Sequence, residues 1–235
     1  MEETVPDLQL AAPDGGKFTG YLALPKKTPA PGVLVIQEIF GVNAVMRGIC
    51  DELAGLGYLA LCPDIFWRQQ PGIQITDKTD AEWQRAFELY KGFDPDLGIG
   101  DLKASLATLR SHPACSGKAG TVGYCLGGFL VYMMAVRSDA DANVSFYGVG
   151  IDGKLTESKS IAKPLLMHIA EKDQFVPSAA QASIRSALAS HRQVTIHVYP
   201  GQDHAFARIG GKHYHKASAD QANARTAAFF KQHLG

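Results

Sequence analysis

The sequence has 235 residues, of which 46% are hydrophobic, so it can bury a sizeable core within one domain. Its 23 basic and 23 acidic residues give a formal net charge of zero. A balanced charge offers no basic patch, so we expect no nucleic-acid partner and no anionic membrane surface as a partner. The acidic N-terminus does not resemble a secretory signal, and no apolar run approaches the roughly 18 residues of a membrane span. We therefore expect a soluble, cytoplasmic protein that handles small molecules.

Short apolar runs rich in β-branched residues alternate with helical patterns along the chain. The segment from Leu8 to Leu24, with a turn at Asp14–Gly16, predicts an antiparallel hairpin. Runs that are apolar on both faces predict buried strands at residues 32–37, 58–62, 120–124, 144–147, 164–169 and 194–199. Helices are predicted at residues 44–56, 80–92, 97–111, 127–138, 178–190 and 217–232. This alternation predicts the α/β class, with a mostly parallel central sheet covered by helices on both faces, in a single domain spanning residues 1–235.

Two of the predicted helices begin with the signature of a capping box. Thr79 and Glu82 form one such signature, and Ser178 and Gln181 form the other. The four cysteines are widely spaced and include no CxxC pair, which argues against a zinc site and against a dense disulfide framework.

The most distinctive motif is a strand that runs into Gly123-x-Cys125-x-Gly127 and is followed at once by a helical pattern. This is the G-x-nucleophile-x-G form of the nucleophile elbow, with cysteine in place of serine. Small flanking residues let strand and helix pass closely at a strained bend, and the helix N-terminus favours a thiolate and a developing oxyanion. The alternative is an ordinary strand–turn–helix with a buried, inert cysteine. A dinucleotide loop fits less well, because the glycine spacing is not G-x-G-x-x-G.

Two further polar residues follow predicted strands downstream of Cys125. Asp173 comes after the strand at 164–169, and His204 comes after the strand at 194–199. Nucleophile, acid and histidine occur in the order of the α/β-hydrolase triad, with all three predicted at the same end of the sheet. His204 would take the thiol proton, and Asp173 would fix the imidazole tautomer. Asp203, beside the histidine, is a rival for the role of the acid.

With these residues in place, the sequence resembles the dienelactone hydrolase (carboxymethylenebutenolidase) family over nearly its whole length. The resemblance is carried by QEIFGVN at 37–43, CPD at 62–64, GYCLGG at 123–128, FYGVG at 146–150, DQFVP at 173–177 and HAFAR at 204–208. It implies an α/β-hydrolase fold and hydrolysis of an enol-lactone in aromatic degradation, through an acyl-thioester intermediate and without a metal or cofactor.

The resemblance also implies roles for individual residues. Cys125, Asp173 and His204 would form the triad, and the backbone N–H groups of Ile39 and Leu126 would form the oxyanion hole. Glu38 would hold the resting thiol and take its proton when substrate arrives. Like-charge repulsion from such a carboxylate would keep the thiol protonated and less prone to oxidation, although the residues alone also allow a solvated loop position.

The substrate pocket departs from the family pattern. The known enzymes hold a substrate carboxylate with two arginines; Arg208 matches one of them, whereas Trp83 stands in the place of the other, and Ala205 replaces the serine after the histidine. Trp83, Phe87 and Tyr90 share one helical face, which either lines an acyl pocket or packs on the core. We expect the substrate-binding residues to be Phe40, Trp83, Phe87, Tyr90, Tyr147 and Arg208.

Two other functions remain as alternatives to dienelactone-type hydrolysis. One is a broad-specificity carboxylesterase or thioesterase that uses the same triad on an unknown acyl group. The other is a catalytically silent α/β-hydrolase that binds a ligand. His213 and His215 lack a suitably spaced carboxylate or cysteine, so no metal site is expected. We expect a monomer that acts on a small lactone or ester.

Overall fold

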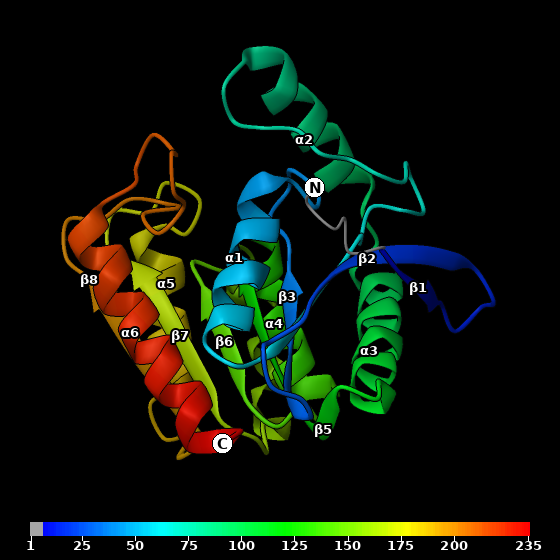
Figure 1. Cartoon of the computed structure of the whole chain (residues 1–235). Helices are drawn as coiled ribbons and strands as arrows, with labels where there is room; N and C mark the ends of the chain where they lie inside the picture. The colour runs from blue at the N-terminus through cyan, green and yellow to red at the C-terminus, as the bar shows by residue number, and fades with distance from the viewer. Residues whose placement is uncertain (1–6) are drawn as a thin grey trace. The chain divides into compact units, whose positions relative to one another are not determined.

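Residues 7–235 are described by the computed structural model, and they divide into two units between Ala119 and Gly120. Each unit has its own strands and covering helices (Figure 1). Within the described residues, no helix has both the length and the apolar character needed to cross a membrane. The single domain over residues 1–235 stays a prediction.

The first unit contains a four-stranded arrangement in the order β1-β2-β4-β3. Strand β1 pairs antiparallel with β2, β2 pairs antiparallel with β4, and β3 runs parallel to β4. The hairpin expected over residues 8–24 is therefore confirmed. The elements of this unit are β1 (Leu8–Ala11), β2 (Lys17–Ala23), β3 (Ala30–Ile36), α1 (Ala44–Gly55), β4 (Leu59–Pro63), α2 (Asp80–Gly92) and α3 (Pro95–Ser111).

Helix starts in the first unit follow from side-chain caps. Asn43 Oδ1 accepts from the backbone N–H groups of Val45 and Met46 at the start of α1. At α2, the Thr79 hydroxyl accepts from Glu82 N–H at 3.2 Å and donates to the Glu82 carboxylate at 3.0 Å. The predicted cap at Thr79 is confirmed, and α2 begins where the sequence indicates.

The second unit is a parallel arrangement in the order β5-β6-β7-β8. Its β-strands alternate with helices, so that each strand after the first is reached through a helical connection (Figure 1). The elements are β5 (Cys115–Tyr124), which starts in the first unit, α4 (Leu126–Arg137), β6 (Asn143–Phe146), the 3₁₀ helix η1 (Ile151–Ser160), β7 (Leu165–Ala170), α5 (Ser178–Leu188), β8 (Val194–Tyr199) and α6 (Lys216–His233).

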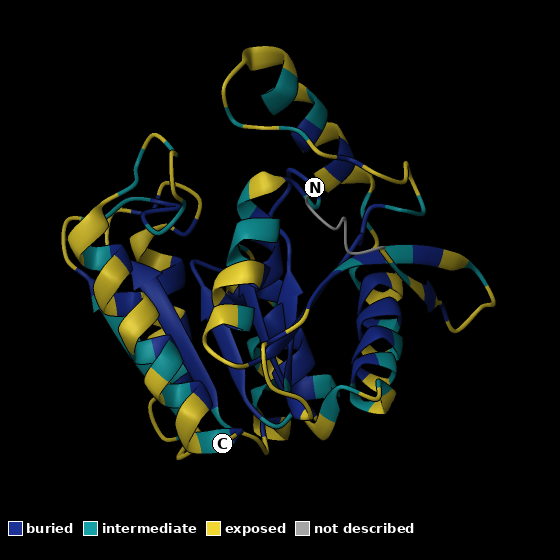
Figure 2. Cartoon of the chain, in the orientation of Figure 1, coloured by how far each residue is buried: buried dark blue, intermediate teal, exposed yellow. Residues whose placement is uncertain are grey.

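Helices cover both faces of β5. A Cβ built on Gly120 would meet Phe230 of α6, whereas one built on Gly123 would meet Val131 of α4. Residues three apart on a strand point to opposite faces, so α6 and α4 lie on opposite sides. Helix α4 is buried along nearly its whole length, whereas α6 buries one face and exposes the other (Figure 2).

Three details of the second unit differ from the sequence-based expectation. Pro177, not Ser178, caps α5, and no side-chain cap bond is made. The predicted capping box at Ser178 is therefore wrong: Gln181 instead donates to the carbonyl groups of the preceding loop, including that of Val176 at 2.8 Å. Strand β5 begins at Cys115, before the strand predicted at residues 120–124, and η1 has no periodic apolar pattern that could have predicted it.

Candidate active site

Cys125 occupies a sharp bend between β5 and α4. Its backbone has φ 56° and ψ −115°, a left-handed conformation that costs a non-glycine residue on the order of 1–3 kcal/mol. The bend is held on both sides, because Cys125 N–H donates to the Phe146 carbonyl at 3.1 Å and Phe129 N–H donates to the Cys125 carbonyl at 3.1 Å. The thiol is half-buried at the N-terminus of α4, where the N–H of Leu126 has no acceptor within the helix.

The glycines beside Cys125 are required by close backbone approach. A Cβ on Gly123 would lie 2.3 Å from the Gly127 carbonyl oxygen. A Cβ on Gly128 would lie 2.3 Å from the Phe146 carbonyl oxygen at the end of β6. Both distances are shorter than any real contact, so the strand and helix can pass only because these residues have no side chain.

Asp173 and His204 meet in the second unit as the sequence order predicts. They follow β7 and β8, two parallel strands paired in register up to Ala170 and Tyr199. His204 Nδ1 lies 2.8 Å from Asp173 Oδ2 and 3.0 Å from Oδ1, and both side chains are buried. Asp173 Oδ1 also accepts from the N–H groups of Phe175 at 2.9 Å and Val176 at 3.2 Å. These bonds fix the rotation of the carboxylate toward the imidazole.

The electrostatic surroundings favour the protonated form of His204. Burial lowers the pKa of this imidazole, but negative charge on Cys125 and the hydrogen bond with Asp173 outweigh burial and raise the pKa to about 10. Cys125 is therefore close enough for its charge to act on the ring. His204 Nε2 itself makes no hydrogen bond of standard geometry with any described residue. We infer that the thiol and the imidazole lie close together without an aligned hydrogen bond.

Asp203 does not serve as the partner of the imidazole. Its Oδ1 accepts from the backbone N–H of His204 at 2.6 Å and from the backbone N–H of Gln174 at 3.2 Å. Its Oδ2 lies 3.0 Å from Nδ1 of His213. The ring of His204 faces Asp173 instead, which leaves Asp203 outside the role of the triad acid.

Aromatic side chains surround the imidazole. The Tyr147 ring lies 5.0 Å from the His204 ring in an edge-to-face arrangement, and the Phe175 ring lies 4.9 Å away in the same manner. Tyr147 has φ 38° and its N–H donates to the carbonyl of His168. Phe175, which is 37% exposed, was not among the predicted site residues, although it lies in the DQFVP motif beside Asp173.

The loop after His204 carries Arg208. Its backbone is closed by short-range bonds: Arg208 N–H donates to Ala205 O at 3.0 Å, and Gly211 N–H donates to Arg208 O at 3.0 Å. The two histidines of this loop have separate tasks, since His213 pairs with Asp203 and the His215 side chain caps α6 by accepting from Ser218 N–H.

The remaining predicted site residues belong to the first unit. Glu38 and Ile39 are buried just after β3, as is Phe40. Phe40 and Trp83 pack edge to face with ring centroids 5.1 Å apart. The predicted aromatic face of α2 exists, because Trp83 and Phe87 are 5.6 Å apart and Phe87 and Tyr90 are each 38% exposed.

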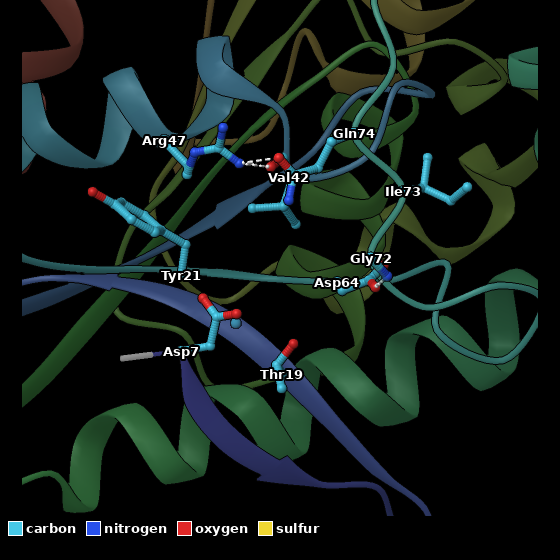
Figure 3. A pocket seen from close by; sticks show the side chains of 10 residues that line it. Asp7, Thr19, Tyr21, Val42, Arg47, Asp64, Gly72, Ile73 and Gln74 are labelled. Carbon is cyan, nitrogen blue, oxygen red and sulfur yellow. Dashed lines mark hydrogen bonds between the residues drawn. The ribbon is translucent and has the colours of Figure 1, made fainter. Parts of the chain in front are cut away.

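A small pocket in the first unit lies beside the start of α1 (Figure 3). Arg47 lies at its wall and donates to the Val42 carbonyl at 2.7 Å and to Gln74 Oε1 at 2.6 Å. Asp64, also in the wall, accepts from the N–H groups of Phe66 and Gly72. The lining residues include none of the predicted catalytic residues, and the polar groups named here already have partners within the unit.

Comparison with known proteins identifies the family of the chain. The sequence profile of the Dienelactone hydrolase family matches residues 18–234. The chain belongs to the dienelactone hydrolase family. Membership of this family makes the protein a hydrolase of carboxylic ester bonds, which include those of lactones.

Relatives of this dienelactone hydrolase family member match nearly end to end. A protein of Azospirillum brasilense is 55% identical, over 97% of this chain and 99% of its own length. The carboxymethylenebutenolidase of Pseudomonas putida is 37% identical, over 92% of each chain.

Solved structures extend the likeness to the fold. A crystal structure from Klebsiella pneumoniae subsp. pneumoniae superposes with a TM-score of 0.84 at 28% identity, over 97% of this chain and 99% of that one. The dienelactone hydrolase of Anabaena variabilis gives a TM-score of 0.70 at 18% identity, over 98% of each chain. The chain thus has the α/β-hydrolase fold with a mostly parallel sheet, as predicted.

Proposed function

We propose that the protein opens a lactone or small ester by a Cys-His-Asp triad that passes through an acyl-thioester. The single observation that carries the proposal is the buried Asp173–His204 pair, 2.8 Å apart, with an imidazole whose pKa is raised by negative charge on Cys125. An inert structural cysteine has no need of a paired imidazole, so this arrangement favours catalysis over ligand binding alone.

The proposed reaction begins when the Cys125 thiolate attacks the acyl carbon and the ester C–O bond breaks. The leaving oxygen takes the proton of the His204 imidazolium, and the acyl group remains on sulfur. Water then attacks the thioester while His204 accepts its proton, which releases the carboxylic acid and restores the cysteine. The Leu126 N–H at the start of α4 would stabilise the oxyanion, and a donor at Ile39 is implied by the family resemblance.

Glu38 and Arg208 complete the proposal. Glu38 would hold the thiol of Cys125 and accept its proton, a role that the family resemblance implies. Arg208 would orient a carboxylate on the substrate, since a guanidinium binds a carboxylate bidentately. The aromatic residue Trp83 in place of a second arginine favours a more apolar acyl group than dienelactone. The natural substrate class that we propose is therefore a lactone or ester with one anionic group.

A panel of variants tests these roles with two substrates, a carboxylate-bearing lactone and a neutral aryl ester. Cys125→Ala should lower kcat/KM for both by roughly three orders of magnitude or more, because the nucleophile is lost.

Glu38→Gln should lower kcat at saturating substrate, and Arg208→Ala should raise KM for the anionic lactone alone.

The matched control is Cys115→Ala, which removes the other half-buried thiol from the start of β5. It should hydrolyse both substrates like the parent. Parent-like hydrolysis by Cys125→Ala would refute the proposed nucleophile. Unchanged kcat in Glu38→Gln, or equal losses for both substrates in Arg208→Ala, would remove that residue from the mechanism.

A further inference from the structure

The loops that carry Asp173 and His204 are joined by hydrogen bonds beyond the ends of β7 and β8. Lys172 N–H donates to the Gln202 carbonyl at 2.7 Å, and Gly201 N–H donates to Glu171 Oε2 at 2.7 Å. These bonds continue the pairing of the two strands past their ends. Neither bond holds the backbone of His204 or that of the residue after Asp173, so the placement of the acid and the base needs a further contact between the loops.

Asp203 makes the loop contact nearest to the acid and the base. Its Oδ1 accepts from two backbone N–H groups, that of His204 itself at 2.6 Å and that of Gln174, the residue after Asp173, at 3.2 Å. One oxygen atom thus holds the backbone of the base and the backbone next to the acid. Hydrogen bonds to a charged acceptor are shorter and stronger than those between neutral groups, which suits a fixed distance.

The second oxygen of Asp203 is anchored on a third segment. Oδ2 lies 3.0 Å from His213 Nδ1, and the two side chains are 30% and 26% exposed. This contact orients the carboxylate so that Oδ1 faces the two amides. His213 belongs to the loop that closes through the bond from His215 N–H to Phe206 O at 2.9 Å, so the anchor is itself attached near His204.

The backbone beside His204 is strained, so a restraint is needed to hold the ring in place. Ala205 has φ 61°, a left-handed value that is unfavourable for alanine. Without a restraint, the turn could relax and carry the imidazole away from Asp173. Displacements of about 1 Å at a reacting group can cost on the order of a hundredfold in rate.

We propose that Asp203 is a positioning residue that holds the Asp173–His204 pair in register through Oδ1, while His213 orients its carboxylate through Oδ2. This inference rests on the proposed function, since it assumes that Asp173 and His204 act together with Cys125. Asp203 would thus raise kcat by holding the acid and the base in place, without touching the substrate.

The test compares Asp203→Ala and Asp203→Asn with Glu171→Ala. Glu171 also joins the two loops, through Gly201 N–H, but it holds neither His204 nor the residue after Asp173. Asp203→Ala should lower kcat roughly tenfold to a hundredfold with little change in KM, because a positioning defect acts on the transition state. Asp203→Asn retains a carbonyl oxygen for both amides and should recover most of that loss. Glu171→Ala should lose some thermal stability but keep the parent's kcat.

A second readout observes the acid–base pair directly. The His204 Nδ1–H proton, followed by NMR, should shift or broaden in Asp203→Ala, while its signal in Asp203→Asn and Glu171→Ala should match the parent. If Asp203→Ala does not fold, His213→Ala replaces it in the test. This variant keeps the Asp203 carboxylate and the two backbone N–H groups that it accepts from, but removes the side chain that orients the carboxylate. It should lower kcat by less than the tenfold to hundredfold expected above.

The positioning role would be overturned if Asp203→Ala kept the parent's kcat, or if Asp203→Ala and Asp203→Asn had equal kcat. Where His213→Ala is used because Asp203→Ala does not fold, a parent-like kcat in His213→Ala would overturn it. Failure of the proposed function looks different. In that case Cys125→Ala hydrolyses like the parent, whatever the Asp203 variants do.

Discussion

Backbone strain is concentrated at single residues around the candidate site. Among the described non-glycine residues, positive φ values occur at Cys125, Tyr147 and Ala205. Cys125 belongs to the proposed triad, the Tyr147 ring packs against that of His204, and Ala205 follows His204 in the chain. Such conformations persist only where surrounding bonds determine them. At Cys125 these bonds come from β6 and α4, which together hold the thiol at the helix N-terminus.

The protonation of His204 provides the pH-dependent prediction. Its pKa of about 10 lies above the value near 6.5 expected for an unfolded histidine. The imidazole's own contribution to stability is therefore fully present below about pH 6.5 and declines as the pH rises toward about 10. In ¹⁵N NMR titrations, the His204 ring should remain protonated well above pH 7.

The control for this titration is Cys125→Ala. Burial alone lowers the pKa of the imidazole, and the charge of Cys125 is the strongest influence that raises it. Removing the thiol should therefore bring the midpoint down toward the ordinary value of about 6.5. A parent imidazole that titrates near that ordinary value, or an identical midpoint in the variant, would show that Cys125 and His204 do not interact as inferred.

At the residue scale, the sequence predicted the pair of Asp173 and His204 but not its support. Each follows a strand, and chain order together with strand order brings them to the same edge of the sheet. The sequence also presented Asp203 beside His204 and could not decide between the two carboxylates. That choice depends on which way the ring turns, and the restraints from Phe175 and Val176 N–H are visible only in the folded loop.

At the scale of elements, apolar periodicity predicted the strands and helices that form the cores of both units. Helix α4 is an example, because its run is apolar all round, as is typical of a buried helix. The exceptions share a physical reason. The start of β5 and the helix η1 are polar segments without an apolar period, and η1 is held by bonds from Tyr132 and Arg137 of α4, which no local pattern predicts.

The close passage of α4 and β6 gives an element-scale prediction. In Gly128→Ala, the new Cβ would lie 2.3 Å from the Phe146 carbonyl oxygen and 2.9 Å from Gly148 Cα, so the backbone must shift. The free energy of unfolding, measured in urea, should fall by about 1–3 kcal/mol, as is typical of overpacked sites.

Gly48→Ala is the matched control in a helix of the first unit. A Cβ on Gly48 would have no heavy atom within 4 Å, so only helix propensity changes. That variant should gain about 0.5–1 kcal/mol. Equal effects of the two substitutions would mean that the contact between α4 and β6 is looser than the distances indicate.

At the scale of the whole chain, the fold and the reaction class rest on agreement between independent observations. The family profile spans residues 18–234, and the structure has a strained bend at Cys125 and a buried Asp173–His204 pair.

The most direct test of the central claim is to identify the atom that carries the acyl group during turnover. An activated aryl ester is mixed rapidly with the protein, the reaction is quenched in acid, and the adduct is located by peptide mass spectrometry. A thioester on the peptide that contains Cys125, absent from Cys125→Ala, is the predicted result. An acyl group on another residue, or undiminished hydrolysis by Cys125→Ala, would contradict the account.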